Sequence, residues 1–152
     1  MEPIKWIVVP VDFSENTDKL VDYAAYIAAA LSARLNFIHV VNLVQGDAML
    51  GMPLSVEFQT RYEKDMKQRM DYLLEDVRDR CPDAKGSVVS GEAVRDIVNY
   101  AETSGADLII ISTHGSKGLE SILLGSVARR VVKHAQCPVL VMNPYKKLHR
   151  DS

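Results

Sequence analysis

The sequence has little cysteine, no excess of basic charge and no long apolar run, and each absence excludes a class of protein. Its two cysteines, Cys81 and Cys137, have no neighbours at metal-ligand spacing, which argues against a disulfide framework or a zinc cluster. The 18 Lys and Arg against 20 Asp and Glu give a formal charge of −2, so neither nucleic acid nor an acidic membrane is an expected partner. No segment approaches the roughly 20 apolar residues that span a bilayer, and the first residues do not resemble a targeting segment. The expected location is the cytoplasm.

What remains is the composition of an ordinary globular chain, with 152 residues of which 47% are hydrophobic and 25% are charged. A chain of about 150 residues buries roughly two thirds of its unfolded surface, enough for one core. We find no internal repeat, linker or low-complexity tract. The sequence therefore predicts a single domain over residues 1–152.

Five short apolar runs predict strands. They span residues 6–11, 35–41, 86–90, 107–112 and 138–142. Unbroken runs of β-branched residues are typical of strands that are buried on both faces, as in parallel sheets. The run at 86–90 is more polar than the others, which indicates a strand at an edge of the sheet.

Between these runs the apolar residues recur at spacings of three and four, which predicts helices. The first helix follows Ser14, which is available to cap its first turn. The other expected helices span residues 58–77, 94–105 and 125–135, and a long surface loop is expected over 42–55.

Strands that alternate with helices favour an α/β fold of three layers, a mainly parallel sheet with helices on both faces. Ligands of such sheets collect beyond the carboxyl ends of the strands, at the point where the strand order reverses. We therefore expect chemistry in the loops after the first and fourth strands.

The segment after the fourth strand, residues 112–127, combines glycines with hydroxyl side chains. Glycine lets backbone N–H groups approach an anion closely, and a helix that begins near Gly125 adds unpaired donors and the positive end of its dipole. This chemistry suits a phosphate, although the spacing matches neither a P-loop nor a dinucleotide fingerprint. The alternative is that these glycines only shape turns.

The same segment resembles the universal stress protein family, whose motif is Gly-x-x-Gly-x(9)-Gly-Ser/Thr before a helix and a strand that commonly begins Cys-Pro-Val-Leu-Val. This chain has Gly115, nine residues, then Gly125 and Ser126, and later Cys-Pro-Val-Leu-Val at 137–141. The opening residues 9–14 are similar to the family's first strand and turn, so the resemblance covers nearly the whole chain. Ser112 departs from the pattern, because the family has a glycine there; its side chain either crowds a ligand or donates a hydroxyl group.

The resemblance implies an adenine-nucleotide alpha-hydrolase-like sheet with strand order 3-2-1-4-5. It also implies that the chain binds ATP, with or without magnesium, and forms a homodimer through the last strand, at Val139, Leu140 and Val141. The residues implied around the adenine, ribose and phosphates are Pro10, Val11, Asp12, Val40, Ile111, Ser112, Gly115, Ser116, Gly125, Ser126 and Val127. Asp12 is the candidate for the ribose hydroxyls and Val40 for an adenine contact.

For several of these residues a simpler role is an alternative to nucleotide binding. Asp12 equally well caps the following helix, or assists a magnesium ion, which takes one or two carboxylates together with phosphate oxygens. Lys117 is a further phosphate candidate, and a solvated loop lysine is its alternative. His114 lacks the partners of a catalytic triad, and His39 is most simply a hydrogen-bonded structural histidine.

The leading hypothesis is a universal stress protein that binds ATP and changes its dimer contacts, or its binding of an unidentified regulatory protein, with nucleotide occupancy. One alternative is an interaction protein that needs no nucleotide. The other is a slow ATP hydrolase with a metal-bound water, for which the sequence offers no convincing general base or arginine.

Overall fold

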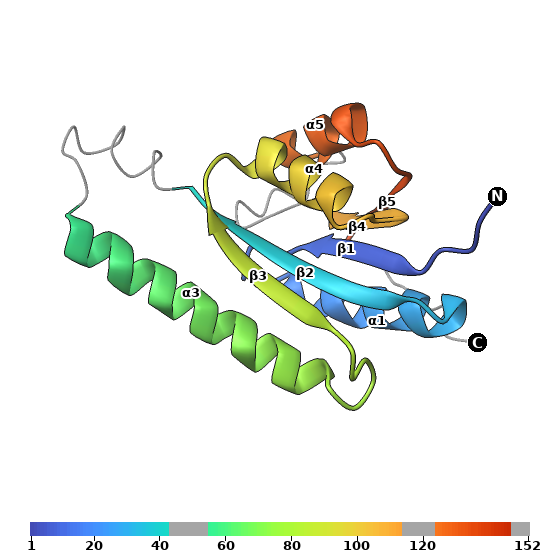
Figure 1. Cartoon of the computed structure of the whole chain (residues 1–152), viewed down its shortest axis with the longest axis horizontal. Helices are drawn as coiled ribbons and strands as arrows, with labels where there is room; N and C mark the ends of the chain where they lie inside the picture. The colour runs from blue at the N-terminus through green and yellow to red at the C-terminus, as the bar shows by residue number, and fades with distance from the viewer. Residues whose placement is uncertain (43–54, 114–123, 147–152) are drawn as a thin grey trace.

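The computed structural model describes residues 1–42, 55–113 and 124–146, which form three layers around a parallel sheet (Figure 1). The strands are β1 (Trp6–Pro10), β2 (Arg34–Val41), β3 (Lys85–Ser90), β4 (Leu108–Ser112) and β5 (Val139–Met142). Their order across the sheet is β3-β2-β1-β4-β5, and every neighbouring pair runs parallel. The expected fold class and strand order are confirmed.

Four helices connect the strands and cover the sheet. They are α1 (Thr17–Leu31), α3 (Val56–Val77), α4 (Ala93–Thr103) and α5 (Ser126–His134). In Figure 1, α1 and α3 lie on one face of the sheet and α4 and α5 on the other. No helix in the three described ranges is long and apolar enough to cross a membrane.

The sheet carries a core on each face because successive side chains of a strand point in opposite directions. Ile7 and Val9 of β1 pack with Phe37 against α1 and α3, whereas Val8 packs with Ile109 against α4 and α5. All five side chains are fully buried, which is why the central runs contain no polar alternation. At the sheet edge, by contrast, β3 is only half-buried along its middle, as its polar sequence predicts.

The turn from β1 into α1 differs from the prediction. Helix α1 begins at Thr17 after Asn16, whose side chain makes no capping hydrogen bond, so Ser14 as the helix cap was wrong. The Ser14 hydroxyl instead accepts from the Asn16 N–H at 3.3 Å, inside the turn. Short polar side chains compete in this way for nearby backbone groups, which delays the start of a helix. Of the predicted surface loop at 42–55, residues 43–54 lie outside the described residues.

Candidate functional site

The point where the strand order reverses lies between β1 and β4, the two central strands. From β1 the chain proceeds through β2 to β3 on one side, and it then returns to β4 on the other. The β1–β4 register pairs Val8 with Ile109, and its continuation sets Pro10 beside Ile111 at the carboxyl edge. Open α/β sheets bind ligands in this crevice, beside the residues that follow β1 and β4.

The chain beyond β1 is held in place by β2. The Val11 N–H donates to the Ile38 carbonyl at 2.8 Å, and the Val11 carbonyl oxygen lies 2.8 Å from Nδ1 of His39. The His39 ring also packs against Phe13, with 4.8 Å between the ring centroids. Phe13 has a φ of 55°, a left-handed conformation in which a bulky residue is strained, and it is therefore held by its surroundings. The hydrogen bond expected for His39 is confirmed.

Asp12 lies at the exposed tip of this turn. Its Oδ1 accepts from the Ser14 N–H at 3.0 Å and from the Thr17 hydroxyl at 3.4 Å. Neither bond involves a backbone N–H of α1, whose N-cap is Asn16, so the alternative that Asp12 caps the helix was wrong and Oδ1 holds the turn instead. Oδ2 has no partner among the described residues, so the second oxygen is left for water or a ligand.

The other wall of the crevice is closed by a backbone hydrogen bond. The Gly125 N–H donates to the Thr113 carbonyl at 2.8 Å, and the Thr113 N–H donates to the Met142 carbonyl at 2.8 Å. A Cβ on Gly125 would lie 2.7 Å from the Thr113 oxygen, closer than real Cβ atoms come, so this contact requires glycine. Sequence reasoning missed Thr113 because it contributes backbone groups, for which the side chain gives no signal.

Helix α5 begins just after this contact and has an open N-terminus. Its first internal hydrogen bond runs from the Arg129 N–H to the Gly125 carbonyl at 2.9 Å. The N–H groups of Ser126, Val127 and Ala128 therefore have no acceptor in the helix, and none of them has a hydrogen-bond partner in the described part of the chain. Ser126 and Val127 are exposed. The backbone donors of these two exposed residues and the positive end of the helix dipole thus lie at the carboxyl edge of β4.

The structure brings most of the predicted residues to one edge of the sheet. Those that it describes there are Pro10, Val11, Asp12, Val40, Ile111, Ser112, Gly125, Ser126 and Val127. Pro10, Val11 and Ile111 are buried, and Val40 and Ser112 are half-buried. Gly115, Ser116, Lys117 and His114 lie outside the described residues.

The described residues of the crevice offer few ligands for a metal ion. Within the described ranges, no group of three or more His, Cys, Asp or Glu side chains comes together to hold a metal ion. Asp12 offers one carboxylate, which suits a magnesium ion that keeps water and phosphate oxygens as its other ligands. The open donors of α5 suit the phosphates themselves, so the described residues fit a nucleotide better than they fit a free metal ion.

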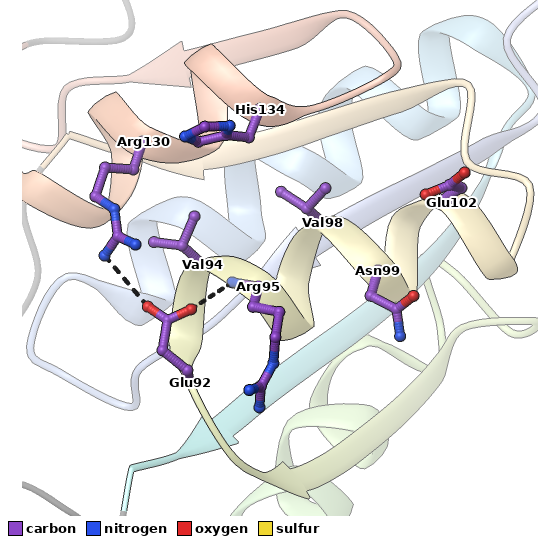
Figure 2. Close-up of a pocket in the computed structure, with 8 residues that line it drawn as sticks. All are labelled: Glu92, Val94, Arg95, Val98, Asn99, Glu102, Arg130 and His134. Carbon is purple, nitrogen blue, oxygen red and sulfur yellow. Dashed lines mark hydrogen bonds and ion pairs between the residues drawn. The ribbon is translucent and has the colours of Figure 1, made fainter.

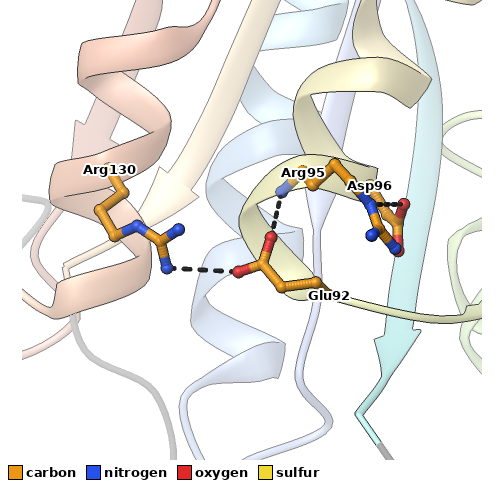
Figure 3. A network of polar contacts seen from close by, with 4 residues as sticks. All are labelled: Glu92, Arg95, Asp96 and Arg130. Carbon is orange, nitrogen blue, oxygen red and sulfur yellow. Dashed lines mark hydrogen bonds and ion pairs between the residues drawn. The ribbon is translucent and has the colours of Figure 1, made fainter.

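A separate hollow of about 310 Å³ lies between α4 and α5 (Figure 2). It is lined by Glu92, Val94, Arg95, Val98, Asn99, Glu102, Arg130 and His134. Glu92 accepts from the Arg95 N–H at 2.7 Å and from Arg130 at 3.2 Å, whereas the Arg95 side chain turns to Asp96 (Figure 3). The Arg95 N–H, followed by the Val94 N–H and then by Arg130, lowers the pKa of the Glu92 carboxyl. These charges pair with one another and do not converge on one point, so we place the candidate site at the crevice.

Comparison with known proteins agrees with the motif. A sequence model described as the universal stress protein family matches residues 3–143. The chain belongs to the universal stress protein family. One family member, universal stress protein MJ0531 of Methanocaldococcus jannaschii, is 35% identical over 147 residues, which cover 94% of this chain and 84% of that protein.

Solved structures of the family share the fold. Protein MJ0577, named a universal stress protein of the same archaeon, superposes with a TM-score of 0.80 at 26% identity and covers 99% of this chain and 100% of its own. A universal stress protein from Archaeoglobus fulgidus was solved in complex with dAMP. It superposes with a TM-score of 0.65 at 22% identity, over 92% of this chain and 98% of its own, a likeness of fold alone.

Proposed function

We propose that this universal stress protein binds an adenine nucleotide, ATP, in the crevice between β1 and β4 and acts as a nucleotide-responsive dimer. The observation that carries the proposal is the start of α5, which the Gly125–Thr113 contact holds beside β4 and where the N–H groups of Ser126 and Val127 have no acceptor among the described residues. The dAMP complex of the Archaeoglobus fulgidus protein supports an adenine nucleotide as the class of ligand.

The phosphates would lie at the start of α5, against the N–H groups of Ser126 and Val127. Backbone donors and a helix dipole supply positive potential without basic side chains, so a chain of net charge −2 can still hold a triphosphate. The other phosphate candidates are proposed to complete the set of groups around the phosphates; they are Gly115, Ser116 and Lys117. Ser112 is the last residue of β4, and we propose that the Ser112 hydroxyl donates to the nucleotide.

The base would lie against the apolar ends of the central strands, at Pro10, Val11 and Ile111. Val40 extends β2 beyond Ile38, the last residue of β2 that pairs with β1. A parallel ladder turns the backbone groups of Ile38 and Val40 toward β1, so Val40 presents an N–H and a carbonyl to the crevice. Adenine has an acceptor, N1, beside a donor, the N6 amino group, and this pair matches one backbone N–H and one carbonyl. Guanine presents the opposite order.

The ribose would lie over the β1 turn, where Oδ2 of Asp12 can accept a hydroxyl group. A comparison of ATP with 2′,3′-dideoxy-ATP, in the wild-type protein and in Asp12→Ala, tests this contact apart from any structural role of Asp12. The wild type is expected to prefer ATP, and Asp12→Ala to lose that preference. An equal preference for ATP in both proteins would show that Asp12 does not contact the ribose.

The dimer would form through the free edge of β5. In the β4–β5 register, Thr113 donates to Met142, so the backbone groups of Leu140 and Met142 face β4 and those of Val139 and Val141 face outward. An apolar edge strand with unpaired backbone groups favours pairing, and a two-fold axis lets the same edge pair with itself. A regulatory protein that distinguishes the occupied dimer from the empty one is the proposed further partner.

Mass spectrometry of small molecules released from freshly purified, denatured protein tests the ligand class directly. An adenine nucleotide released in near-stoichiometric amount supports the proposal. Equilibrium dialysis against ATP and GTP then measures selectivity, with the expected preference for ATP. Release of no nucleotide, together with no retention of ATP in dialysis, would contradict the proposal and favour an interaction protein that needs no nucleotide.

A further inference from the structure

His39 occupies a hydrogen-bonding position that a backbone group normally fills. Where β1 meets β2, the ladder proceeds regularly up to the bond from the Val11 N–H to the Ile38 carbonyl. The next bond of a parallel ladder would run from the Val40 N–H to the Val11 carbonyl. No such bond forms, although both residues lie in the described part of the chain; Nδ1 of His39 is 2.8 Å from the Val11 oxygen instead.

This geometry fixes the protonation of the ring. A carbonyl oxygen only accepts, so Nδ1 must carry a hydrogen atom. Burial lowers the pKa of His39, which keeps the ring neutral and makes Nε2 an unprotonated acceptor. Nε2 is itself buried and has no partner among the described residues, so a second hydrogen atom there would be costly.

We propose that His39 is a positioning residue of the nucleotide site: its Nδ1–H takes the place of the Val40 N–H at the Val11 carbonyl and leaves the Val40 N–H free for the base. The inference rests on the proposed function, because it explains why the Val40 N–H, the donor proposed to recognise adenine, makes no bond to Val11. It also explains why a polar ring lies on the same face of β2 as Phe37, beside the apolar core under α1 and α3, with only 7% of its surface exposed.

The same contact orders the β1 turn. Both backbone polar groups of Val11 are hydrogen-bonded to β2, the N–H to Ile38 and the carbonyl to His39. The His39 ring in turn packs against Phe13, which bears the left-handed conformation of the turn. Asp12 lies between these two held residues. A change at His39 therefore acts on the base through Val40 and on the ribose contact through Asp12.

Two variants separate hydrogen bonding from packing. In His39→Asn, the side-chain amide keeps an N–H donor at the position of Nδ1. In His39→Leu, no donor remains, and the Val40 N–H is expected to bond to the Val11 carbonyl as in a regular ladder. We expect ATP to bind His39→Asn with close to the wild-type dissociation constant and His39→Leu about tenfold more weakly, the effect of one lost hydrogen bond.

Nuclear magnetic resonance of the ligand-free protein measures the tautomer of His39 and the amide exchange rate of Val40, which a role of His39 in packing alone would not determine. Long-range ¹H–¹⁵N spectra are expected to show the Nδ1–H tautomer of His39 at neutral pH. Amide hydrogen exchange at Val40 is expected to be fast in the ligand-free wild type, slower after addition of ATP, and slow without ATP in His39→Leu.

An Nε2–H tautomer or a charged ring at neutral pH would overturn the inference, as would equal ATP affinity in the wild type and His39→Leu. Failure of the wild-type protein to bind ATP contradicts the proposed function, whereas wild-type binding with an unchanged His39→Leu contradicts only the role of His39. A loss in His39→Leu that His39→Asn does not restore would assign the effect to packing and also overturn the inference.

Discussion

The backbone N–H of Gly125 donates to the carbonyl of Thr113, and no side chain larger than hydrogen fits at Gly125 while this bond is formed. The contact joins the end of β4 to the start of α5. It thereby sets where the open N-terminus of α5 lies relative to the crevice. Nucleotide binding should therefore depend on Gly125 more than on any side chain of α5.

Gly125→Ala tests this relationship. The added Cβ would lie 2.7 Å from the Thr113 oxygen, so α5 or the end of β4 must shift. We expect the affinity for ATP to fall about tenfold or more, because the α5 donors no longer point at the phosphates together. Isothermal titration measures the change, and circular dichroism verifies that the helices are retained.

Gly105→Ala is the matched control. Gly105 lies between α4 and β4, at the opposite edge of the sheet, and has a φ of 67° with nothing within 4 Å of a Cβ. The substitution should cost about 1 kcal/mol of stability through backbone strain and leave ATP affinity unchanged. Equal losses of affinity in the two variants would attribute the effect of Gly125→Ala to general destabilisation.

Asp12 should contribute to stability through Oδ1, independently of any nucleotide. Asp12→Ala removes the acceptor for the Ser14 N–H and the Thr17 hydroxyl and is expected to cost about 1 kcal/mol, as the loss of a hydrogen bond does. Asp12→Asn keeps an oxygen at that position and should cost much less. Urea unfolding of ligand-free protein measures both; an equal cost in the two variants would show that the charge, and not the acceptor, matters.

Acid should destabilise the protein partly through His39. Burial, the largest cause, lowers its pKa below the ordinary 6.5, and Arg69 acts in the same direction, against the Val11 carbonyl and Asp12, which raise it. The unfolded chain therefore binds this proton at higher pH than the folded chain. The contribution is complete above pH 6.5 and is lost as the pH falls toward the folded-state pKa.

Urea midpoints at about pH 7.5 and about pH 5.5 measure this loss, since stability falls wherever the unfolded state binds more protons. His39→Asn, which does not titrate in this range, should lose less stability on acidification than the wild type. The same loss in both proteins would mean that other groups govern the acid sensitivity.

The β5 edge makes a separate prediction about assembly. Val141→Pro removes an outward-facing N–H without removing a bond to β4, and proline is tolerated at such edge positions. We expect it to abolish the dimer, whereas Val141→Thr, which keeps the N–H and the branched side chain, should remain dimeric. Sedimentation equilibrium distinguishes the two, and a wild-type protein that is monomeric at micromolar concentration would contradict the proposed interface.

The local elements of the fold follow from the sequence because burial dictates their patterns. The residues of β1, and those of β4 up to Ile111, are apolar without interruption since helices cover both faces of the sheet, and the polar run of β3 marks an edge. The order of the strands, in contrast, depends on pairing between distant segments and came from the resemblance to the family. The start of α1 was wrong because Ser14 bonds within the turn and not to the helix.

The site was only partly predictable for a related reason. Side chains such as Asp12 and glycines such as Gly125 leave a signal in the sequence, whereas the Thr113 carbonyl and the Val40 N–H belong to the backbone that every residue has. His39 was identified as hydrogen-bonded from its apolar neighbours Phe37, Ile38 and Val40. Its acceptor, the Val11 carbonyl, becomes apparent only when β1 and β2 lie side by side.

Isothermal titration of nucleotide-free wild-type protein with ATP is the most direct test of nucleotide binding in the crevice. We expect saturable binding of one ATP per chain, with GTP markedly weaker. No heat and no retained nucleotide at protein concentrations well above micromolar would contradict it.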